Sequence, residues 1–341
     1  MYDPEARPRP LIFGCAGLTL CGEERDLFAG TNPYGFILFD RNIDNPAQVR
    51  GLIHDLRDSV GRQDAPILID QEGGRVARLK PPHWWAPPAA GHFESCLGNG
   101  TEKAREAIFI NSQIIAHELS EIGISVDCMP VLDLSIDAGH KVIGNRSYSA
   151  EPNRVGEFGR AACLGLLSGG VLPVIKHIPG HGRAACDSHV SLPVVQTGWE
   201  ELVRTDFIPF KMLSNMPLAM TGHVLFTSID PRRPATISPL VIADVIREEI
   251  GFEGLLMTDD ICMSALEGSP VERAEAALFA GCDLVLHCNG QLDEMIDISH
   301  RIGVMAHSTW KRAVRVGESL EKNIASFDLA LAKRELAALL A

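Results

Sequence analysis

Reactive side chains are concentrated in one segment of the chain, residues 174–193, which reads VIKHIPGHGRAACDSHVSLP. Asp187 stands two residues before His189 in this segment. At that separation a carboxylate can hold one ring nitrogen of the imidazole, which fixes the tautomer and raises the basicity of the other nitrogen. The alternative is that the two residues belong to a solvated turn without a function. Lys176 and His177 just upstream favour a functional Asp–His pair. The segment therefore suits acid–base chemistry.

Two glycines flank His181 in the same segment. Long loops with glycine hinges are more often functional than filler, and they can close over a bound substrate. We therefore expect the loop that carries Asp187 and His189 to move during the reaction.

Two adjacent carboxylates, Asp259 and Asp260, end another apolar run. Burying two carboxylates in a packed core is costly, so at least one of them needs a cation, hydrogen bonds or solvent. One can act as a nucleophile, a base or a metal ligand, whereas a helix N-cap is the structural alternative. Side chains alternate along a strand, so we expect only one of the two to point into a site at the strand end.

Charged or imidazole side chains also follow other apolar runs, namely Asp70, Arg78, Arg146, Lys176 and His223. Arginine and lysine donate to hydroxyl or carbonyl oxygens, and aspartate accepts from sugar hydroxyls, so this mixture suits a polar pocket. Ordinary ion pairs at the rim of a barrel are the alternative for the arginines. His223 is expected to line the same pocket, with its role open.

Eight short apolar runs must position these side chains, and amphipathic helical stretches separate them. Most runs are continuously apolar, which is typical of parallel strands covered on both faces. The expected strands cover residues 11–16, 35–39, 66–70, 125–134, 172–177, 218–224, 254–259 and 283–287. The pattern favours a (β/α)8 TIM barrel over an open doubly wound sheet, because no G-x-G-x-x-G turn follows a strand. In such barrels catalytic groups lie at the C-terminal strand ends, where the polar residues stand here.

Caps and prolines mark the expected helix starts. Asn45 with Pro46 opens a stretch that runs to about Val60, and Glu151 with Pro152 opens another. A further helix is predicted over residues 200–215, headed by Thr197.

Length and composition fit one α/β domain. The chain has 341 residues, of which 46% are hydrophobic and 22% are charged. We expect a single catalytic domain over residues 1–341, with a barrel core at about 10–305, long βα loops and C-terminal accessory helices at about 306–341. The net charge of −13 repels phosphate backbones and anionic lipids. Neither nucleic acid nor a membrane is an expected partner.

The expected location is cytoplasmic. The N-terminal residues do not show a cationic segment followed by an apolar one, and no apolar run approaches the roughly 18–20 residues of a membrane span. The nine cysteines are scattered without a C-x-x-C pair, as expected for reduced thiols. We expect a monomer that acts on a small molecule, without a cofactor or a metal.

Four motifs resemble those of one enzyme family. They are K-H-I-P-G-H-G-x4-D-S-H at 176–189, I-D-Q-E-G-G-R-V-A-R at 69–78, G-N-R-S-Y at 144–148 and T-D-D-I at 258–261. Together they are similar to the signature of family 3 β-N-acetylhexosaminidases, the NagZ-like enzymes of bacterial cell-wall recycling. The matches keep the family's order and span about residues 10–290.

The resemblance implies a retaining hydrolase that removes terminal β-linked N-acetylglucosamine (GlcNAc). Asp259 would be the nucleophile that forms a glycosyl-enzyme, and His189 would be the general acid/base with Asp187 as its partner. The residues that would hold the sugar are Asp70, Arg78, Arg146, Lys176 and His177. The implied substrates are muropeptides in which GlcNAc is joined to 1,6-anhydro-N-acetylmuramic acid, with or without a peptide.

Three alternatives stay open. A metal-dependent barrel hydrolase would use as ligands His177, His181, His189, Asp259 and Asp260, although such barrels usually carry H-x-H on an early strand and this chain has none. Substrate-assisted cleavage would let the acetamido oxygen of the substrate attack in place of an enzyme carboxylate. A sugar-binding barrel without activity would need only Asp70, Arg78 and Lys176.

Overall fold

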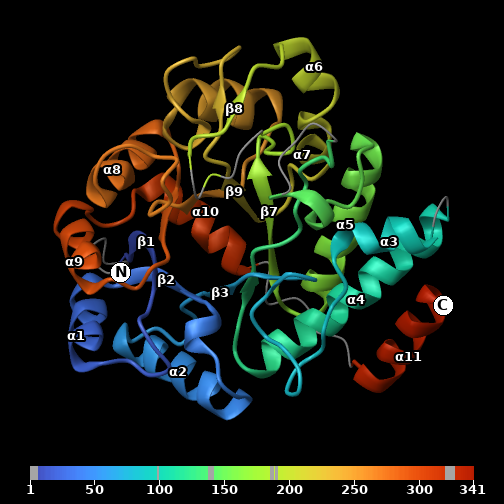
Figure 1. Cartoon of the computed structure of the whole chain (residues 1–341). Coiled ribbons are helices and arrows are strands. Elements are labelled where there is room, and N and C mark those ends of the chain that lie inside the picture. The colour runs from blue at the N-terminus through green and yellow to red at the C-terminus, as the bar shows by residue number, and fades with distance from the viewer. Residues whose placement is uncertain (1–6, 98–99, 137–141, 185–187, 189–190, 319–326) are drawn as a thin grey trace.

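The computed structural model describes residues 7–97, 100–136, 142–184, 188, 191–318 and 327–341. Eight parallel strands close into a barrel in the order β1-β12-β11-β9-β7-β6-β3-β2, with helices around the outside (Figure 1). The strands are β1 (Arg9–Gly14), β2 (Pro33–Leu38), β3 (Ile67–Ile69), β6 (Val126–Asp127), β7 (Leu172–Ile178), β9 (Leu218–Thr221), β11 (Leu255–Asp260) and β12 (Leu284–His287). The predicted TIM barrel is confirmed.

The helices, in chain order, are α1 (Gly22–Thr31), α2 (Pro46–Ser59), α3 (Ala90–Leu97), α4 (Thr101–Glu121), α5 (Pro152–Ser168), α6 (Trp199–Arg204), α7 (Phe207–Met212), a π-helix (Val241–Glu249), α8 (Pro270–Ala280), α9 (Leu292–Arg301), α10 (His307–Glu318) and α11 (Leu329–Leu340). Single 3₁₀ turns cover Asp40–Asn42, Gly144–Arg146 and Ala235–Ile237. Two small strand pairs lie outside the barrel: the antiparallel β4 (Gln71–Gly73) and β5 (Val76–Ala77), and the parallel β8 (Val194–Val195) and β10 (Leu225–Phe226).

The hydrophobic core has two layers, one inside the barrel and one between the strands and the surrounding helices, because the strands are apolar on both faces. Alternate residues of each strand face opposite sides, so Ile12 packs inside the barrel while Leu11 and Phe13 pack outward beneath the helices. The barrel interior is filled by side chains from all eight strands, as in other barrels of this type. At the N-terminal end of the barrel, Met305, which precedes α10, and Val316, which lies in α10, belong to the same interior cluster.

The helix signals at Asn45 and Glu151 are confirmed. The side chain of Asn45 accepts from the amides of Ala47 and Gln48, and the side chain of Glu151 caps α5 in the same way. These contacts satisfy amides that have no partner within the helix.

Two predicted elements are wrong in extent. The strand expected over 125–134 is only β6, because Pro130 has no N–H for the ladder; beyond it, contact with β7 continues through single bonds such as Leu132 N–H to the carbonyl of Lys176. The helix expected over 200–215 is divided into α6 and α7. Pro209 has no N–H to donate to the carbonyl of Thr205, so the helical ladder breaks between them.

The C-terminal segment packs on the outside of the barrel. α11 lies against α4, where Lys333 Nζ is 3.2 Å from Glu118 Oε1 and 5.3 Å from the centre of the Trp85 ring (Figure 1). The division into a core of about 10–305 and accessory helices of about 306–341 stays a prediction. Among the helices of the described residues, none is long and apolar enough to cross a membrane.

Candidate active site

A cavity of about 240 Å³ opens at the C-terminal ends of the barrel strands. Six of its lining residues were predicted to belong to one site: Asp70, Arg78, Arg146, Lys176, His177 and Asp259. They come from the ends of β3, β7 and β11 and from the loops that follow β3 and β6. The structure therefore brings together all of the described residues that were expected to bind substrate or to act as the nucleophile.

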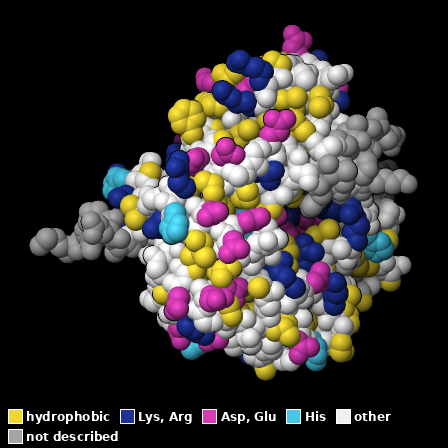
Figure 2. Space-filling model, turned by 60° about the vertical axis from the view of Figure 1, so that its left-hand side comes forward, with side chains coloured by type: hydrophobic (Ala, Val, Ile, Leu, Met, Phe, Trp, Pro, Cys, Tyr) yellow, Lys and Arg dark blue, Asp and Glu magenta, His cyan; other side chains and the backbone are white. Residues whose placement is uncertain are grey.

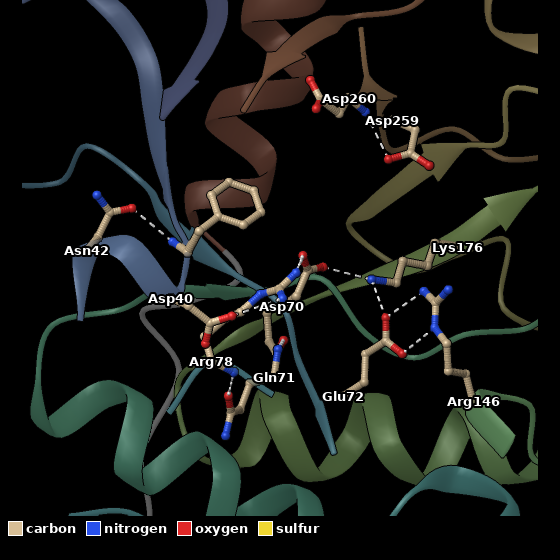
Figure 3. Close-up of polar contacts among 12 residues, drawn as sticks. Asp40, Asn42, Asp70, Gln71, Glu72, Arg78, Arg146, Lys176, Asp259 and Asp260 are labelled. Atoms are coloured by element: carbon tan, nitrogen blue, oxygen red, sulfur yellow. Dashed lines mark hydrogen bonds and ion pairs between the residues drawn. The ribbon is translucent and has the colours of Figure 1, made fainter. Parts of the chain in front are cut away.

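An alternating chain of charges forms one wall of this cavity (Figure 3). Lys176 Nζ lies 2.9 Å from Asp70 Oδ1 and 2.6 Å from Glu72 Oε1. At one end Arg78 Nη2 donates to Asp70 Oδ2 at 2.9 Å. At the other, Arg146 donates to both oxygens of Glu72, each at 2.8 Å. We call these five residues the charge chain; since buried charges are costly unless paired, its members hold one another in place.

The carboxylates of the charge chain stay ionised. Burial alone would raise the pKa of Glu72, but Lys176 and Arg146 outweigh it and lower the pKa to about 2. Burial is likewise outweighed at Asp70, whose pKa the cations of Lys176 and Arg78 hold below its ordinary value. Burial would lower the pKa of Lys176, and the two carboxylates raise it instead. Hydroxyl groups of a ligand would meet fixed, fully charged partners.

Glu72 is a site residue that the sequence prediction missed. It lies in β4, within the 69–78 motif, between Asp70 and Arg78. Its position depends on Gly73, at φ 103°, where an added Cβ would lie 2.3 Å from the carbonyl oxygen of Pro88. The glycine therefore lets the β4–β5 hairpin lie against the 87–89 segment with Glu72 turned to Lys176. The sequence did contain a signal for Glu72, because this carboxylate stands between two predicted sugar-binding residues, Asp70 and Arg78, in the same motif.

Asp133 is the second missed residue. Its Oδ2 lies 2.6 Å from His177 Nδ1, and its Oδ1 accepts the backbone amide of His181 at 2.6 Å. Burial would raise the pKa of Asp133, but His177 outweighs it and lowers the pKa. Burial and the neighbouring His177 lower the pKa of His181 to about 4. Asp133 therefore fixes the orientation of His177, leaving its Nε2 for a ligand.

Asp259 and Asp260 both line the cavity, and their carboxylates point apart (Figure 3), as strand alternation predicts. Asp260 Oδ1 accepts the amides of Cys262 at 3.0 Å and Cys288 at 3.1 Å, so this carboxylate holds two loops together. Asp259 Oδ1 accepts the amide of Asp260 at 2.8 Å, and the residue is 9% exposed. Asp260 thus stabilises the two loops, whereas the carboxylate of Asp259 can contact a ligand.

His223 does not line the cavity, so that prediction is wrong. Its ring is completely buried between Thr236 Oγ1, 2.7 Å from Nδ1, and the carbonyl oxygen of Asp260, 2.9 Å from Nε2. Burial lowers the pKa of His223. A histidine at a strand end was expected to line the pocket because the sequence does not show that Thr236 and the backbone of Asp260 cover it. The contacts of His223 support the backbone at Asp260 instead.

Asp187 and His189, the predicted acid/base pair, lie outside the described residues. Ser188 between them is described, and it lines the cavity with its carbonyl accepting the amide of Ala265 at 3.1 Å. This contact ties one point of the predicted loop to the segment after β11.

Four of the five ligands that a metal-dependent hydrolase would need are described, and these four are not grouped around a common point. Within the described part of the chain, His177, His181, Asp259 and Asp260 do not bring three ligand atoms within reach of one ion. The group of described residues that does so lies elsewhere, at Cys262, His287 and Glu294.

Comparisons with known proteins agree with this site. Residues 21–319 match the family model "Glycosyl hydrolase family 3 N terminal domain". A β-hexosaminidase of Thiobacillus denitrificans is 36% identical over 286 residues, which are 82% of this chain and 78% of the relative. One of Alkalilimnicola ehrlichii is 39% identical over 287 residues, covering 82% and 80% of the two chains.

Solved structures show the same architecture. NagZ from Neisseria gonorrhoeae, in complex with N-trifluoroacetyl-D-glucosamine, superposes with a TM-score of 0.88 at 30% identity, covering 99% of this chain and 100% of that one. A family 3 β-N-acetylglucosaminidase from Paenibacillus gives 0.87 at 27% identity, covering 99% and 68%. The alternatives of a metal-dependent hydrolase and of an inactive sugar-binding barrel give way to these findings. The chain belongs to glycosyl hydrolase family 3, as a β-hexosaminidase of the NagZ-like type.

Proposed function

We propose that this β-hexosaminidase is a retaining exo-enzyme that releases terminal β-linked GlcNAc from peptidoglycan-derived muropeptides. The observation that carries the proposal is that Asp259 shares one cavity with the charge chain and His177. The cations and carboxylates of that wall suit the hydroxyl groups of a pyranose, and Asp259 supplies the nucleophile that a retaining mechanism requires.

In the first step, a carboxylate oxygen of Asp259 forms a bond to the anomeric carbon, and the bond from that carbon to the glycosidic oxygen breaks. The leaving oxygen takes a proton from the imidazolium of His189, whose other nitrogen Asp187 holds. Retaining glycosidases usually supply this proton from a second carboxyl group. The sequence offers the Asp187–His189 pair instead, because an imidazole with a pKa near 6.5 can give a proton and take it back.

In the second step, water attacks the anomeric carbon, and neutral His189 accepts the proton that this water loses. The bond to Asp259 breaks, so GlcNAc leaves with its original β configuration and the enzyme returns to its starting state. Asp70, Arg78, Arg146, Lys176 and His177 hold the sugar through both steps. Asp133 and Glu72 position His177, Lys176 and Arg146.

The aglycone in this proposal is 1,6-anhydro-N-acetylmuramic acid, with or without a peptide, as the family resemblance implies. Recycled fragments of this kind fit a cytoplasmic monomer that needs no cofactor. Acidic and basic side chains are interspersed on the face in Figure 2, which suits a small ligand better than a polyanion.

The proposal is tested with aryl β-glycosides that differ only at C2 of the sugar. We expect the acetamido sugar to be hydrolysed with a kcat/KM far above that of the 2-hydroxy sugar, and NMR of the first product to show the β anomer. Equal rates for both sugars would contradict the substrate assignment. An α product would contradict the retaining mechanism.

A further inference from the structure

A second group of reactive side chains lies near the active-site cavity but outside its lining. Cys262 follows β11, His287 ends β12, and Glu294 lies in the first turn of α9. One ligand atom from each lies within 4.8 Å of the other two. None of the three lines the active-site cavity. We propose that they bind a structural divalent cation of borderline softness, for which Zn²⁺ is the best match.

The spacing of the three ligand atoms is close to that of a tetrahedral site. His287 Nε2 lies 2.8 Å from Glu294 Oε2, and Cys262 Sγ lies 3.9 Å from the same oxygen. Bond lengths to zinc of about 2.3 Å for sulfur and about 2.0–2.2 Å for nitrogen and oxygen separate such ligands by about 3.4 and 3.6 Å. Movements of about 0.6 Å or less would therefore open the hydrogen-bonded pair and admit an ion.

The burial of the group provides both a fixed ligand and an entrance. The ring of His287 is completely buried and packs edge-on against Phe13 at 5.9 Å. Its Nδ1 has no partner among the described residues, so Nε2 is the nitrogen that faces the group. Glu294 is 33% exposed at its side chain and Cys262 is half-buried, which leaves a path from solvent. Three protein ligands leave the fourth position of a tetrahedral ion for water.

Neighbouring groups hold the ligands in position. Asn289 Nδ2 donates to Glu294 Oε2 at 2.7 Å, which is the kind of outer contact that orients a ligating carboxylate. Arg273 donates to the carbonyls of Ile261 and Met263, on either side of Cys262. Both the carboxylate and the loop with the thiol are thereby anchored.

The donor set selects the type of cation. A thiolate favours zinc over magnesium or calcium, which prefer oxygen ligands alone. Binding requires that the thiol of Cys262 release its proton to solvent. The carboxylates of Glu294 and of Asp260, which accepts the amide of Cys262, supply negative charge close by.

The position of the site indicates a structural role. Asp260 Oδ1 accepts the amides of Cys262 and Cys288, so the loop after β11 and the end of β12 already meet at this carboxylate. A cation held by Cys262, His287 and Glu294 would join the same two segments to α9. The cation would then stabilise the position of the strand end that carries Asp259.

Titration of the chelator-treated full chain with Co²⁺ tests the site by its spectrum. A cysteine thiolate bound to Co²⁺ gives a near-ultraviolet charge-transfer band that histidine and carboxylate ligands do not give. The active-site cavity also has a thiol in its lining, that of Cys288, so the Cys262→Ser variant is needed to tell the two sites apart. We expect the band to saturate at one equivalent and to disappear when Zn²⁺ is added. Zn²⁺ is also expected to raise the Tm of the chain.

Variants then assign the band to these residues. Cys262→Ser should abolish the band. Asn289→Ala, which removes an outer contact, should weaken cobalt binding by ~10–100-fold. Glu294→Gln, at a partly exposed position, should weaken it by more than that, because it removes a ligand. The matched control is Cys96→Ser, because exposed Cys96 lies 3.2 Å from Nε2 of His92 and the described residues supply no third ligand there. Its band and its rise in Tm with Zn²⁺ should equal those of the unaltered chain.

Three results would overturn the proposal. They are the absence of a thiolate band at stoichiometric Co²⁺, a full band in Cys262→Ser, and an unchanged affinity in Glu294→Gln whose circular dichroism spectrum shows the native fold. Loss of the band in Cys96→Ser would place the bound ion at the exposed pair instead.

Discussion

Asp133 Oδ2 lies 2.6 Å from Nδ1 of His177, and the other oxygen of the same carboxylate accepts the amide of His181 at 2.6 Å. One buried carboxylate thus sets both the ring of His177 and the backbone of the loop that follows. The histidine predicted to hold the sugar is therefore positioned by a residue that lies outside the cavity lining.

Replacing Asp133 with Asn should lower kcat/KM for an aryl β-GlcNAc substrate by about 10- to 150-fold, because a hydrogen bond to a charged group contributes about 1.5–3 kcal/mol. Asn can offer an NH₂ group to Nδ1, which would reverse the ring's donor and acceptor sides. The pH dependence of kcat/KM should change as well, which general loosening of the fold would not cause. A kcat/KM and a pH profile equal to those of the unaltered chain would contradict the positioning role.

Glu72 should make the fold sensitive to acid. Its pKa is about 2 in the folded chain and 4.5 ordinarily, so the unfolded state binds its proton first as the pH falls. The stability that Glu72 contributes, about 3 kcal/mol by linkage, is complete above about pH 4.5 and is lost as the pH falls towards 2.

The measurement is urea unfolding from pH 6 to pH 2 for the unaltered chain and for Glu72→Gln. The variant should be less stable at pH 6 by about 3–5 kcal/mol, since Lys176 and Arg146 lose a partner. It should also lose less stability between about pH 4.5 and pH 2. Carboxylates outside the charge chain titrate in both proteins and cancel in the difference, whereas Asp70, which shares Lys176 with Glu72, does not cancel fully. Parallel curves would show that Glu72 is not held in its charged form.

Asp259 and Asp260 should respond differently to the same isosteric change. Asp259→Asn removes the proposed nucleophile and should lower kcat by at least ~10⁴-fold. Asp260→Asn keeps an oxygen for the amides of Cys262 and Cys288 and should stay within about tenfold of normal. Steady-state kinetics on one aryl glycoside compares the two. A larger loss in Asp260→Asn would exchange their assigned roles.

His189→Ala should slow substrates with poor leaving groups the most, by ~10²–10⁴-fold, because these need a proton as the bond breaks. Activated aryl glycosides should lose less in the glycosylation step. His54→Ala is the control, since this histidine has a side chain 68% exposed. Losses that are independent of the leaving group would argue against the acid role.

The sequence predicted the barrel and most of the cavity for a physical reason. Parallel strands that are buried on both faces show continuous apolar runs, and their C-terminal ends converge, so polar residues at those ends must meet. Asp70, Lys176 and Asp259 were therefore placed correctly in one cavity. The number of strands followed from the same pattern, whereas the strand expected over 125–134 was too long.

The missed residues depend on contacts that spacing does not encode. Asp133 stands in a run that was read as an uninterrupted strand, and only the fold shows that its carboxylate meets a histidine 44 positions later. Cys262 and Glu294 are 32 positions apart and lie on different elements. A motif search finds ligands at short, regular spacing, so this group could not be recognised before the structure brought it together.

The most direct test of the account is mass spectrometry of the chain after reaction with a fluorinated GlcNAc donor that forms the glycosyl-enzyme quickly and releases it slowly. The account predicts one added sugar per chain, located by peptide mapping on Asp259 and absent from Asp259→Asn. A trapped sugar on another residue, or rapid turnover of the donor by Asp259→Asn, would contradict the assignment of Asp259 as the nucleophile.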